Sequence, residues 1–419
     1  MASDTTIDAG SMSEGYDGPT GLALTALDPD FSEDPYPILA RLRETEPVHY
    51  DAMLKRYVLT RHADVNAILR DLSLWSDPRK ANPDTFTRTF LSRAGREDEE
   101  PSMLLMDDPD HRRLRELVNR SFTPRAVERW REHVRGIAER LAADLPDGPF
   151  DLIERYADPI PSVVIAEMMG LDTSSYADFK AWSNVSVAVG FNPMPTEDQM
   201  REAERAEQAL DAFFREEIAK RHASPGEDLI SDMVTVEEQG DRLTEDEIVR
   251  HCNLLLIAGN VTTTDLIGNA VKSLIDFPEQ QAKLCADLDL VGEAVDETLR
   301  FDPPVTNSGR VASRDMEFHG VKIAKGETLS VSLAAANHDP RVHPDPDAFD
   351  LDRADKSTLA FGGGRHFCLG SHLAKVEAQE ALRALYGRLG PLRLGPGGGE
   401  RASIPSFRGF VRLEVEPAS

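Results

Sequence analysis

The segment with the clearest chemical potential is rich in glycine and contains a cysteine, Phe361-Gly-Gly-Gly-Arg-His-Phe-Cys-Leu-Gly370. Three consecutive glycines let a backbone approach another group closely and take conformations that other residues avoid. Cys368 stands where this loop leads into an expected helix, whose free N–H groups and dipole favour the thiolate. A thiolate is the form of cysteine that binds a metal ion. The plainer alternative is a turn with an inert, buried cysteine.

A second segment, Ala258-Gly-Asn-Val-Thr-Thr263, lies inside a long apolar pattern. Ala258 and Thr262 are four residues apart, so on a helix they share one face. For Thr263 and Thr264 the plainer explanation is a hydroxyl that bonds back to its own helix.

Two charged pairs also have helical spacing. Glu297 and Arg300 can pair at i, i+3, and His111 and Arg115 share a face at i, i+4. By themselves these are weak signals, because a surface ion pair and a solvated basic face are the default explanations.

Helices dominate the elements expected to position these residues. The longest begins at the capping box Thr244-Glu-Asp-Glu247 and runs to about Asp276, ahead of Phe277-Pro278. A last helix, from about Leu369 to Leu389, follows the cysteine loop. Only short strands are expected, at 49–50, 57–60, 316–323 and 328–332.

Two stretches are expected to be irregular. Residues 1–28 are polar and aperiodic and are interpreted as a flexible lead-in to one body, residues 29–419. The stretch from Ser76 to Asp110 contains several prolines and an acidic run, and is interpreted as a long loop.

Composition narrows the class of protein. The 419 residues have a formal charge of −27, which disfavours nucleic acid or an anionic membrane as the main partner. Three scattered cysteines make a disulfide framework improbable, and the chain shows neither a signal peptide nor an apolar run long enough to span a membrane. We therefore expect a cytoplasmic protein.

The cysteine segment matches Phe-x-x-Gly-x-x-x-Cys-x-Gly position for position and so resembles the haem-binding segment of the cytochrome P-450 family. The other segments follow in the family's order, and the resemblance runs from about Phe31 to the C-terminus. It implies a mainly α fold with minor β, a single helical body with small antiparallel sheets. Haem b would lie between the long central helix and the helix that follows Cys368.

The resemblance also implies roles for residues around the cofactor. Cys368 would supply the thiolate ligand of the iron, within a loop whose Phe361, Gly362 and Gly370 contact the haem. The haem propionates would be held by four donors, which are His111, Arg115, Arg310 and His366. Glu297 and Arg300 would form a buried structural network. This chain has Ala348 where many relatives have Arg, so the third member of the network could instead be Arg353.

On the opposite side of the haem, the resemblance assigns the oxygen-binding face to Ala258, Gly259, Val261 and Thr262, where the threonine supports a water relay. The chain departs from the family at Val261, because most members have Asp or Glu there. Valine cannot donate a proton. Either another chain of donors serves Thr262, or proton supply is slow and reduced oxygen is lost as peroxide.

The resemblance implies a monooxygenase that uses O2 and electrons from a separate ferredoxin or flavodoxin with its NAD(P)H-dependent reductase. Arg112, Arg113, Arg120 and Lys375 are candidates for the docking patch. The expected substrate pocket is apolar and includes Leu255, Val305, Thr306 and Phe407, which favours a hydrophobic organic substrate. Two alternatives stay open, a peroxide-driven peroxygenase and a haem-binding sensor without turnover.

Overall fold

The computed structural model describes residues 19–418 except 94–95, 173–175, 193 and 239–240, and most of them are helical. The α-helices are α1 (Pro29–Glu33), α2 (Tyr36–Thr45), α3 (His62–Arg70), α4 (Phe86–Arg93), α5 (Asp110–Val118), α6 (Pro124–Glu128), α7 (Arg131–Ala143), α8 (Pro159–Met168), α9 (Tyr176–Gly190), α10 (Glu197–Ala223), α11 (Leu229–Thr235), α12 (Glu245–Asp276), α13 (Pro278–Ala286), α14 (Val291–Phe301), α15 (Leu333–Asn337) and α16 (Ser371–Leu389). The strands are β1 (Val48–Asp51), β2 (Arg56–Leu59), β3 (Phe150–Asp151), β4 (Glu237–Glu238), β5 (Asp241–Arg242), β6 (Asn307–Val311), β7 (Met316–Phe318), β8 (Val321–Ile323), β9 (Thr328–Ser332), β10 (Leu392–Arg401) and β11 (Phe410–Pro417).

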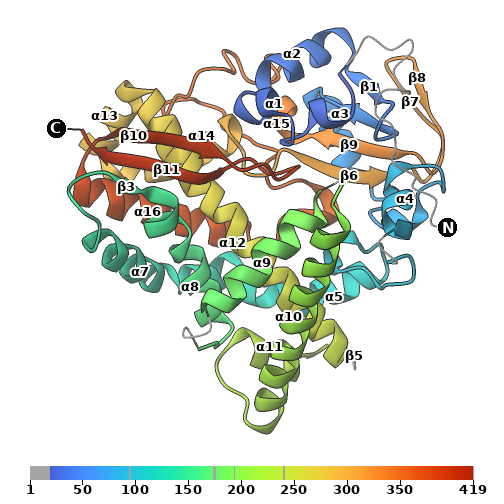
Figure 1. Ribbon diagram of the computed structural model, residues 1–419, viewed down its shortest axis with the longest axis horizontal. Coiled ribbons are helices and arrows are strands. Elements are labelled where there is room, and N and C mark those ends of the chain that lie inside the picture. Colours follow the sequence, from blue (N-terminus) through green and yellow to red (C-terminus); the bar gives the residue numbers. More distant parts are fainter. Residues whose placement is uncertain (1–18, 94–95, 173–175, 193, 239–240, 419) are drawn as a thin grey trace.

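Helix α12 crosses the middle of the molecule (Figure 1). Its 32 residues span roughly 48 Å at 1.5 Å per residue. The predicted capping box is present, because the Thr244 hydroxyl accepts from the Glu247 N–H and the Glu247 carboxylate accepts from the Thr244 N–H. Among the described residues, α12 is the one helix long and apolar enough to cross a membrane, yet 67% of that stretch is buried inside the fold, as in the core helix of a soluble protein.

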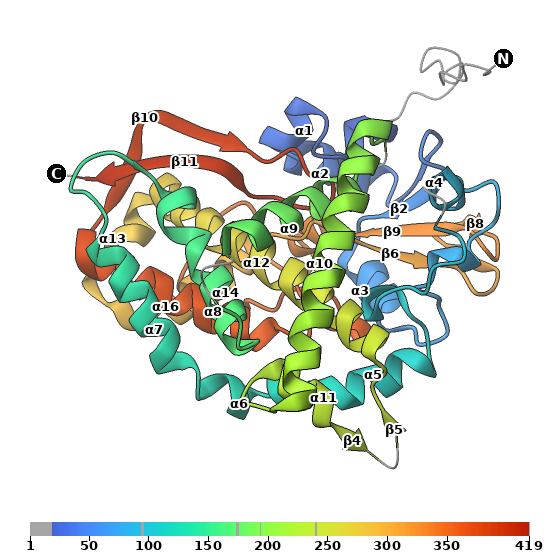
Figure 2. The same cartoon turned by 60° about the horizontal axis from the view of Figure 1, so that its bottom comes forward.

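The main core surrounds α12. Apolar side chains of α7, α8 and α16 pack with those of α12 in one large cluster, and a smaller cluster lies under the four-stranded sheet. In Figure 2 helices α7, α8 and α16 lie toward the left and strands β2, β9 and β6 of the four-stranded sheet toward the right, with α10 in front. The site residues come from both regions, so they are positioned by two separate packed cores.

The main sheet has the order β1-β2-β9-β6 and differs in one respect from the expected antiparallel sheets. Strands β1 and β2 form the expected hairpin, and β6 pairs antiparallel with β9, but β2 pairs parallel with β9. A parallel pair requires a long crossover connection, and most of the chain separates these two strands. The hairpin β10–β11, which joins β3 in a second sheet, was not predicted.

Both stretches expected to be irregular are more ordered than predicted. Between Ser76 and Asp110 the structure has helix α4 and short 3-10 turns at Pro78–Lys80 and Met103–Leu105. Within the expected lead-in, residues 1–18 lie outside the described residues, whereas the Thr20 hydroxyl donates to Asp51 and Leu24 is buried. The packed body therefore begins before residue 29, because Leu24 packs with Leu42 of α2 and Val58 of β2.

Candidate functional site

The cysteine loop is closed on itself just before α16. The backbone N–H of Cys368 donates to the carbonyl of Phe361 over 2.9 Å, and α16 begins at Ser371 with Gly370 as its N-cap. Gly362 and Gly364 have φ of +69° and +65°, as the glycine run predicted. A Cβ at Gly364 would lie 2.3 Å from the carbonyl oxygen of Leu69, so glycine is required for the loop to pass α3.

The Cys368 side chain is half-buried in this turn. Burial raises the pKa of its thiol, whereas a hydrogen bond from the backbone of Gly370 and the positive charge of Arg115 lower it. Arg115 also donates to the carbonyl of Phe367 over 2.7 Å, which ties α5 to the loop. A bound cation would add to the two influences that favour the thiolate.

The structure gathers the four predicted donors near that loop. The imidazole rings of His111 and His366 lie 4.2 Å apart, and His366 hydrogen-bonds to the Ser76 hydroxyl over 2.9 Å. Burial, then the charges of neighbouring His111 and Arg310, lower the pKa of His366 to about 2. Burial and then Arg115 lower the pKa of His111.

Arg310, on β6, completes this donor cluster (His111, Arg115, Arg310 and His366). Burial and then the charge of Arg365 lower the pKa of Arg310 to about 10. Burial lowers the pKa of all four donors, and the charges of the other three lower the pKa of His366 further, so the site is short of negative charge. The arrangement fits a ligand with carboxylate groups, because an anion would relieve both the repulsion and the burial of charge.

The candidate oxygen-binding face of α12 is less covered than the rest of that helix. Ala258 is exposed and Gly259, Val261 and Thr262 are half-buried, although most residues of the helix are buried. The Thr262 hydroxyl donates to the carbonyl of Ala258 over 2.8 Å.

The structure corrects the expectation for Thr263 and Thr264. Back-bonding within the helix was expected for this pair, yet the hydroxyl of Thr263 hydrogen-bonds to Glu377 of α16, and that of Thr264 has no hydrogen-bond partner among the described residues. The hydroxyl that bonds back is that of Thr262. Packing against α16 provides an acceptor for Thr263 that the sequence of α12 does not reveal.

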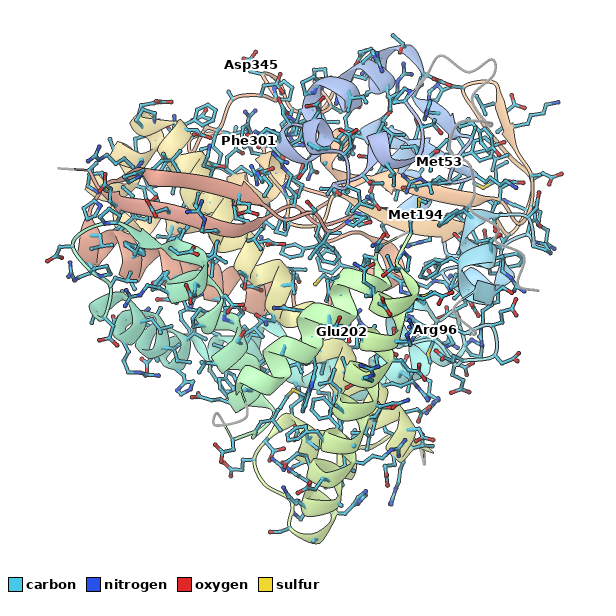
Figure 3. All side chains as sticks on the ribbon, viewed as in Figure 1. Met53, Arg96, Met194, Glu202, Phe301 and Asp345 are labelled. Atoms are coloured by element: carbon cyan, nitrogen blue, oxygen red, sulfur yellow. The ribbon has the colours of Figure 1, made fainter. Side chains whose placement is uncertain are left out.

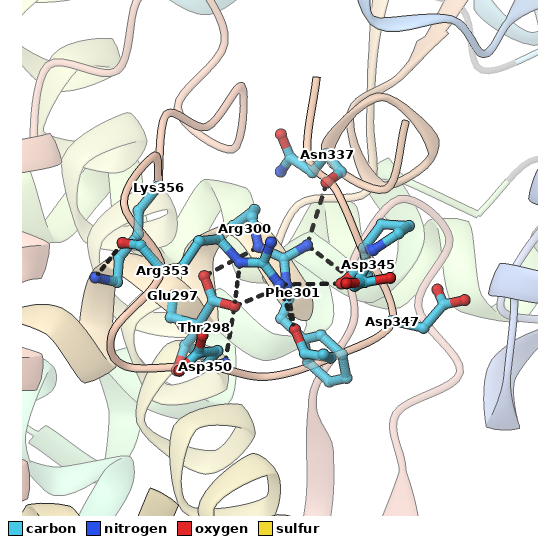
Figure 4. Close-up of polar contacts among 12 residues, drawn as sticks. Glu297, Thr298, Arg300, Phe301, Asn337, Asp345, Asp347, Asp350, Arg353 and Lys356 are labelled. Carbon is cyan, nitrogen blue, oxygen red and sulfur yellow. Dashed lines mark hydrogen bonds and ion pairs between the residues drawn. The ribbon is translucent and has the colours of Figure 1, made fainter. Parts of the chain in front are cut away.

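Glu297 and Arg300 form the predicted buried network (Figure 4). Both side chains are fully buried, and they are joined by contacts of 2.8 and 3.0 Å. Arg353 is the third member, with its Nε 3.0 Å from Glu297. Arg300 also donates to the carbonyls of Pro346 and Ala348, so the network ties α14 to the meander that precedes the cysteine loop.

Three of the four candidate pocket residues come together. Val305 forms an isolated antiparallel β-bridge with Phe407, and the backbone N–H of Thr306 donates to the carbonyl of Ser406 in the same turn. The Phe407 ring packs edge-on against that of Phe191, with the ring centroids 4.7 Å apart. Leu255 is buried with the main core around α12. Phe191 and Met194, in the turn before α10, are 37% and 44% exposed, and Figure 3 labels Met194 at the upper end of the green helices.

The sequence did not lead us to two buried carboxyl groups close to the candidate oxygen-binding face of α12. Asp265 follows Thr262 by three residues, and Glu377 contacts Thr263 from α16. Asp265 could have been predicted from its helical spacing, because it lies three residues after Thr262 and seven after Ala258. Nothing in the sequence pairs Glu377 with α12, because that contact depends on how two distant helices pack.

A helical fold with a cysteine loop, a donor cluster and an uncovered face on its central helix defines a class of haem-thiolate oxygenases. The family model described as Cytochrome P450 matches residues 79–386, and this chain belongs to that family. It is therefore an oxidoreductase of the monooxygenase type, and its cofactor is haem held through a cysteine thiolate.

Individual relatives cover almost the whole chain. The chain is 38% identical over 392 residues to the vitamin D(3) 25-hydroxylase of Pseudonocardia autotrophica, an alignment that covers 92% of this chain and 94% of that protein. The ligand-free structure of CYP164A2 from Mycobacterium smegmatis superposes with a TM-score of 0.85 at 37% identity, covering 93% and 98% of the two chains. CYP109E1 from Bacillus megaterium in complex with testosterone has a TM-score of 0.81 at 28% identity, covering 92% and 100%.

Proposed function

We propose that this chain inserts one oxygen atom of O2 into a hydrophobic organic substrate with electrons from a separate ferredoxin. The observation that carries the proposal is the attachment of the donor cluster to the cysteine loop, through Arg115 and the carbonyl of Phe367. That contact supports the proposal, because donors for carboxylates beside a thiolate would meet the two requirements that a haem makes of its protein. The body from about residue 19 onward is proposed to act as one haem domain in the cytoplasm.

Each group of residues has a proposed task. Cys368 holds the iron, and the donor cluster orients the propionates, with Phe361, Gly362 and Gly370 against the cofactor. When bound, haem supplies the iron at which O2 is activated, and the thiolate donates electron density to it. Thr262 passes protons along the α12 face, where Ala258 and Gly259 leave room for a small ligand.

The proposed substrate is an apolar molecule of about steroid size. The candidate pocket residues Val305 and Phe407 are apolar, and Phe191, in the exposed apolar turn that also contains Met194, packs against the Phe407 ring. One relative is named for vitamin D(3) and another is solved with testosterone. Leu255 and Thr306 would contribute from the helix and the sheet edge.

Spectroscopy of the purified holoprotein tests the proposal. The reduced carbon monoxide complex should show the strongly red-shifted Soret band of thiolate ligation, and its absence would contradict the assignment of the ligand. Vitamin D(3), testosterone and a long-chain fatty acid should then be screened by the haem spin-state shift. Product should appear with ferredoxin, its reductase and NAD(P)H, which excludes a sensor without turnover.

A peroxygenase is the second candidate function, and Val261 is the observation that favours it. An enzyme without an acid next to Thr262 could use peroxide, which already contains the electrons and protons that O2 lacks. Turnover that is faster with hydrogen peroxide than with ferredoxin and NAD(P)H would favour this alternative. The reverse order would favour the monooxygenase.

The redox partner is expected to dock near Arg112, which is exposed, as is Arg120 of the same candidate basic patch. Arg113 pairs with Glu247, and Lys375 pairs with Asp296 at 2.7 Å, so these two charges are partly neutralised. Arg112→Glu should slow reduction by ferredoxin about 10-fold at low salt, with a smaller effect at high salt. Arg201→Glu, a charge reversal on α10, is the control, and an equal effect of both variants would remove Arg112 from the docking patch.

A further inference from the structure

A row of side chains follows one side of α12. Ala258, Val261, Thr262 and Asp265 are spaced i, i+3, i+4 and i+7, so they leave the helix on the same face. Asp265 lies one turn beyond Thr262, on the side away from Ala258. The acid that Val261 does not provide is therefore present on this face, one turn further along.

The carboxyl group of Asp265 is enclosed and incompletely bonded. The side chain is 5% exposed, and its Oδ2 atom has no hydrogen-bond partner in the described part of the chain. Its Oδ1 atom occupies space beside Gly409, where a Cβ would lie only 1.8 Å from that oxygen. A buried carboxyl with a free oxygen costs stability if it is ionised, and therefore favours the protonated form.

The charged groups that act on Asp265 lie on its far side from Thr262. Burial raises the pKa of Asp265 to about 8, the charge of Arg401 on β10 opposes this, and that of Asp302 after α14 reinforces it. Arg401 pairs with Asp302 at 3.3 Å and donates to Asn269 over 3.1 Å. Asp265 is thus an acid that keeps its proton near neutral pH.

The backbone against which Asp265 packs borders a surface pocket. Gly409, against which the carboxyl packs, lines a surface pocket together with Arg401, Ser406, Phe407 and Arg408. Polar groups of Arg401 and Ser406 in this pocket can hold water. Asp265 is therefore separated from this pocket by Gly409, and it lies one helical turn from Thr262.

We propose that Asp265 supplies protons to Thr262 and so replaces the acid that is missing at Val261, an inference that rests on the proposed monooxygenase function. The Thr262 hydroxyl donates to the carbonyl of Ala258, which leaves its oxygen free to accept. Asp265 passes its proton to Thr262 Oγ1 through one intervening water, while Thr262 gives its own proton to the oxygen being reduced. The carboxylate regains a proton from water, and the electrons come from NAD(P)H through ferredoxin.

The first test compares Asp265→Asn with the parent holoenzyme without substrate, driven by ferredoxin, its reductase and NADPH. The variant should release at least about 10-fold more peroxide relative to water formed, because a positioned acid accelerates proton transfer by about 10²–10⁴-fold. In the parent this peroxide share should be low below pH 8 and rise as the pH passes about 8, where Asp265 ionises. The pH dependence should be absent from the variant, and an unchanged peroxide share or pH profile would overturn the proposal.

Glu377→Gln is the matched control, because Glu377 is an equally buried carboxyl whose pKa burial also raises to about 8, but it contacts Thr263. Its peroxide share should equal that of the parent. A raised peroxide share in Glu377→Gln together with an unchanged share in Asp265→Asn would contradict the assignment to Asp265. Adding Val261→Glu to Asp265→Asn should restore the low peroxide share, which a purely structural defect would not allow.

Infrared spectra of the resting holoenzyme give a readout that needs no turnover. A carboxylic acid C=O band that shifts in D2O and disappears near pH 8 should be lost in Asp265→Asn and kept in Glu377→Gln. Retention of every acid band in Asp265→Asn would show that this group is already ionised, and would refute the proposal. Failure of these tests would leave the thiolate Soret band and substrate turnover intact, so it is distinct from failure of the proposed function.

Discussion

Replacing Cys368 by serine should abolish product formation and the red-shifted Soret band of the reduced carbon monoxide complex. A serine hydroxyl is not ionised at neutral pH, so it cannot provide the anionic, electron-donating ligand that a thiolate provides. The donor cluster is unchanged by this substitution, so haem should still bind, more weakly and with a spectrum lacking thiolate ligation. Absorbance spectra and NAD(P)H-driven turnover of the purified variant measure both effects.

Cys285→Ser is the matched control. Cys285 is also half-buried, lies on α13, and has a pKa raised by burial, but it is remote in sequence from the glycine-rich loop. Its replacement should leave the Soret band and turnover at parent values. If the band survived in Cys368→Ser and vanished in Cys285→Ser, the assignment of the iron ligand would be wrong.

Replacing Glu297 by alanine should lower the free energy of unfolding by about 3–5 kcal/mol, the usual cost of leaving a buried charge without its partner. Glu297 neutralises two guanidinium groups, those of Arg300 and Arg353, and it also accepts from the backbone N–H of Asp350. The substitution would leave the fully buried Arg300 without a counterion. Urea unfolding of the holoprotein, followed by circular dichroism, measures the change.

Asp289→Ala provides the comparison, because it removes an ion pair of similar length from the surface. Asp289 is 88% exposed and contacts Arg383 at 3.1 Å. Its loss should change the free energy of unfolding by no more than about 1 kcal/mol. Equal effects of the two substitutions would mean that Glu297 is not the centre of a buried network.

Glu297→Ala should also show that the buried network affects the stability of the fold and not the ligation of haem. Glu297→Ala should lower the unfolding midpoint while the surviving folded protein keeps the thiolate Soret band, because the network supports the meander and not the sulfur itself. If folded Glu297→Ala protein lost the thiolate Soret band, the network would instead be needed to hold the cysteine loop in place.

Several elements were predictable because their causes are local. The capping box at Thr244 and the proline after Phe277 mark the two ends of α12, and both ends lie where the sequence places them. Gly362 and Gly364 take positive φ angles that only glycine adopts easily. Glu297 and Arg300 meet because one turn of helix brings them together, and Arg353 joins them as expected.

Other features could not be predicted, because they depend on contacts between distant segments. The short strands β2 and β9 carry no mark of their parallel pairing, and helix α4 forms inside a stretch whose prolines suggested a loop. The hydroxyls of Thr262 and Thr263 have the same local sequence context. Only the packing of α16 against α12 decides that Thr263 bonds to Glu377 while Thr262 bonds to its own helix.

The family, the cysteine that holds the iron in our proposal, and the absence of an acid at Val261 could be inferred from residue types at fixed spacing. The burial of Asp265 beside Gly409, with one oxygen that has no partner among the described residues, depends on packing between distant segments. The reason is physical, since a carboxyl's position on a helix is set by local geometry, whereas its proton is held by the burial and charges that other segments impose.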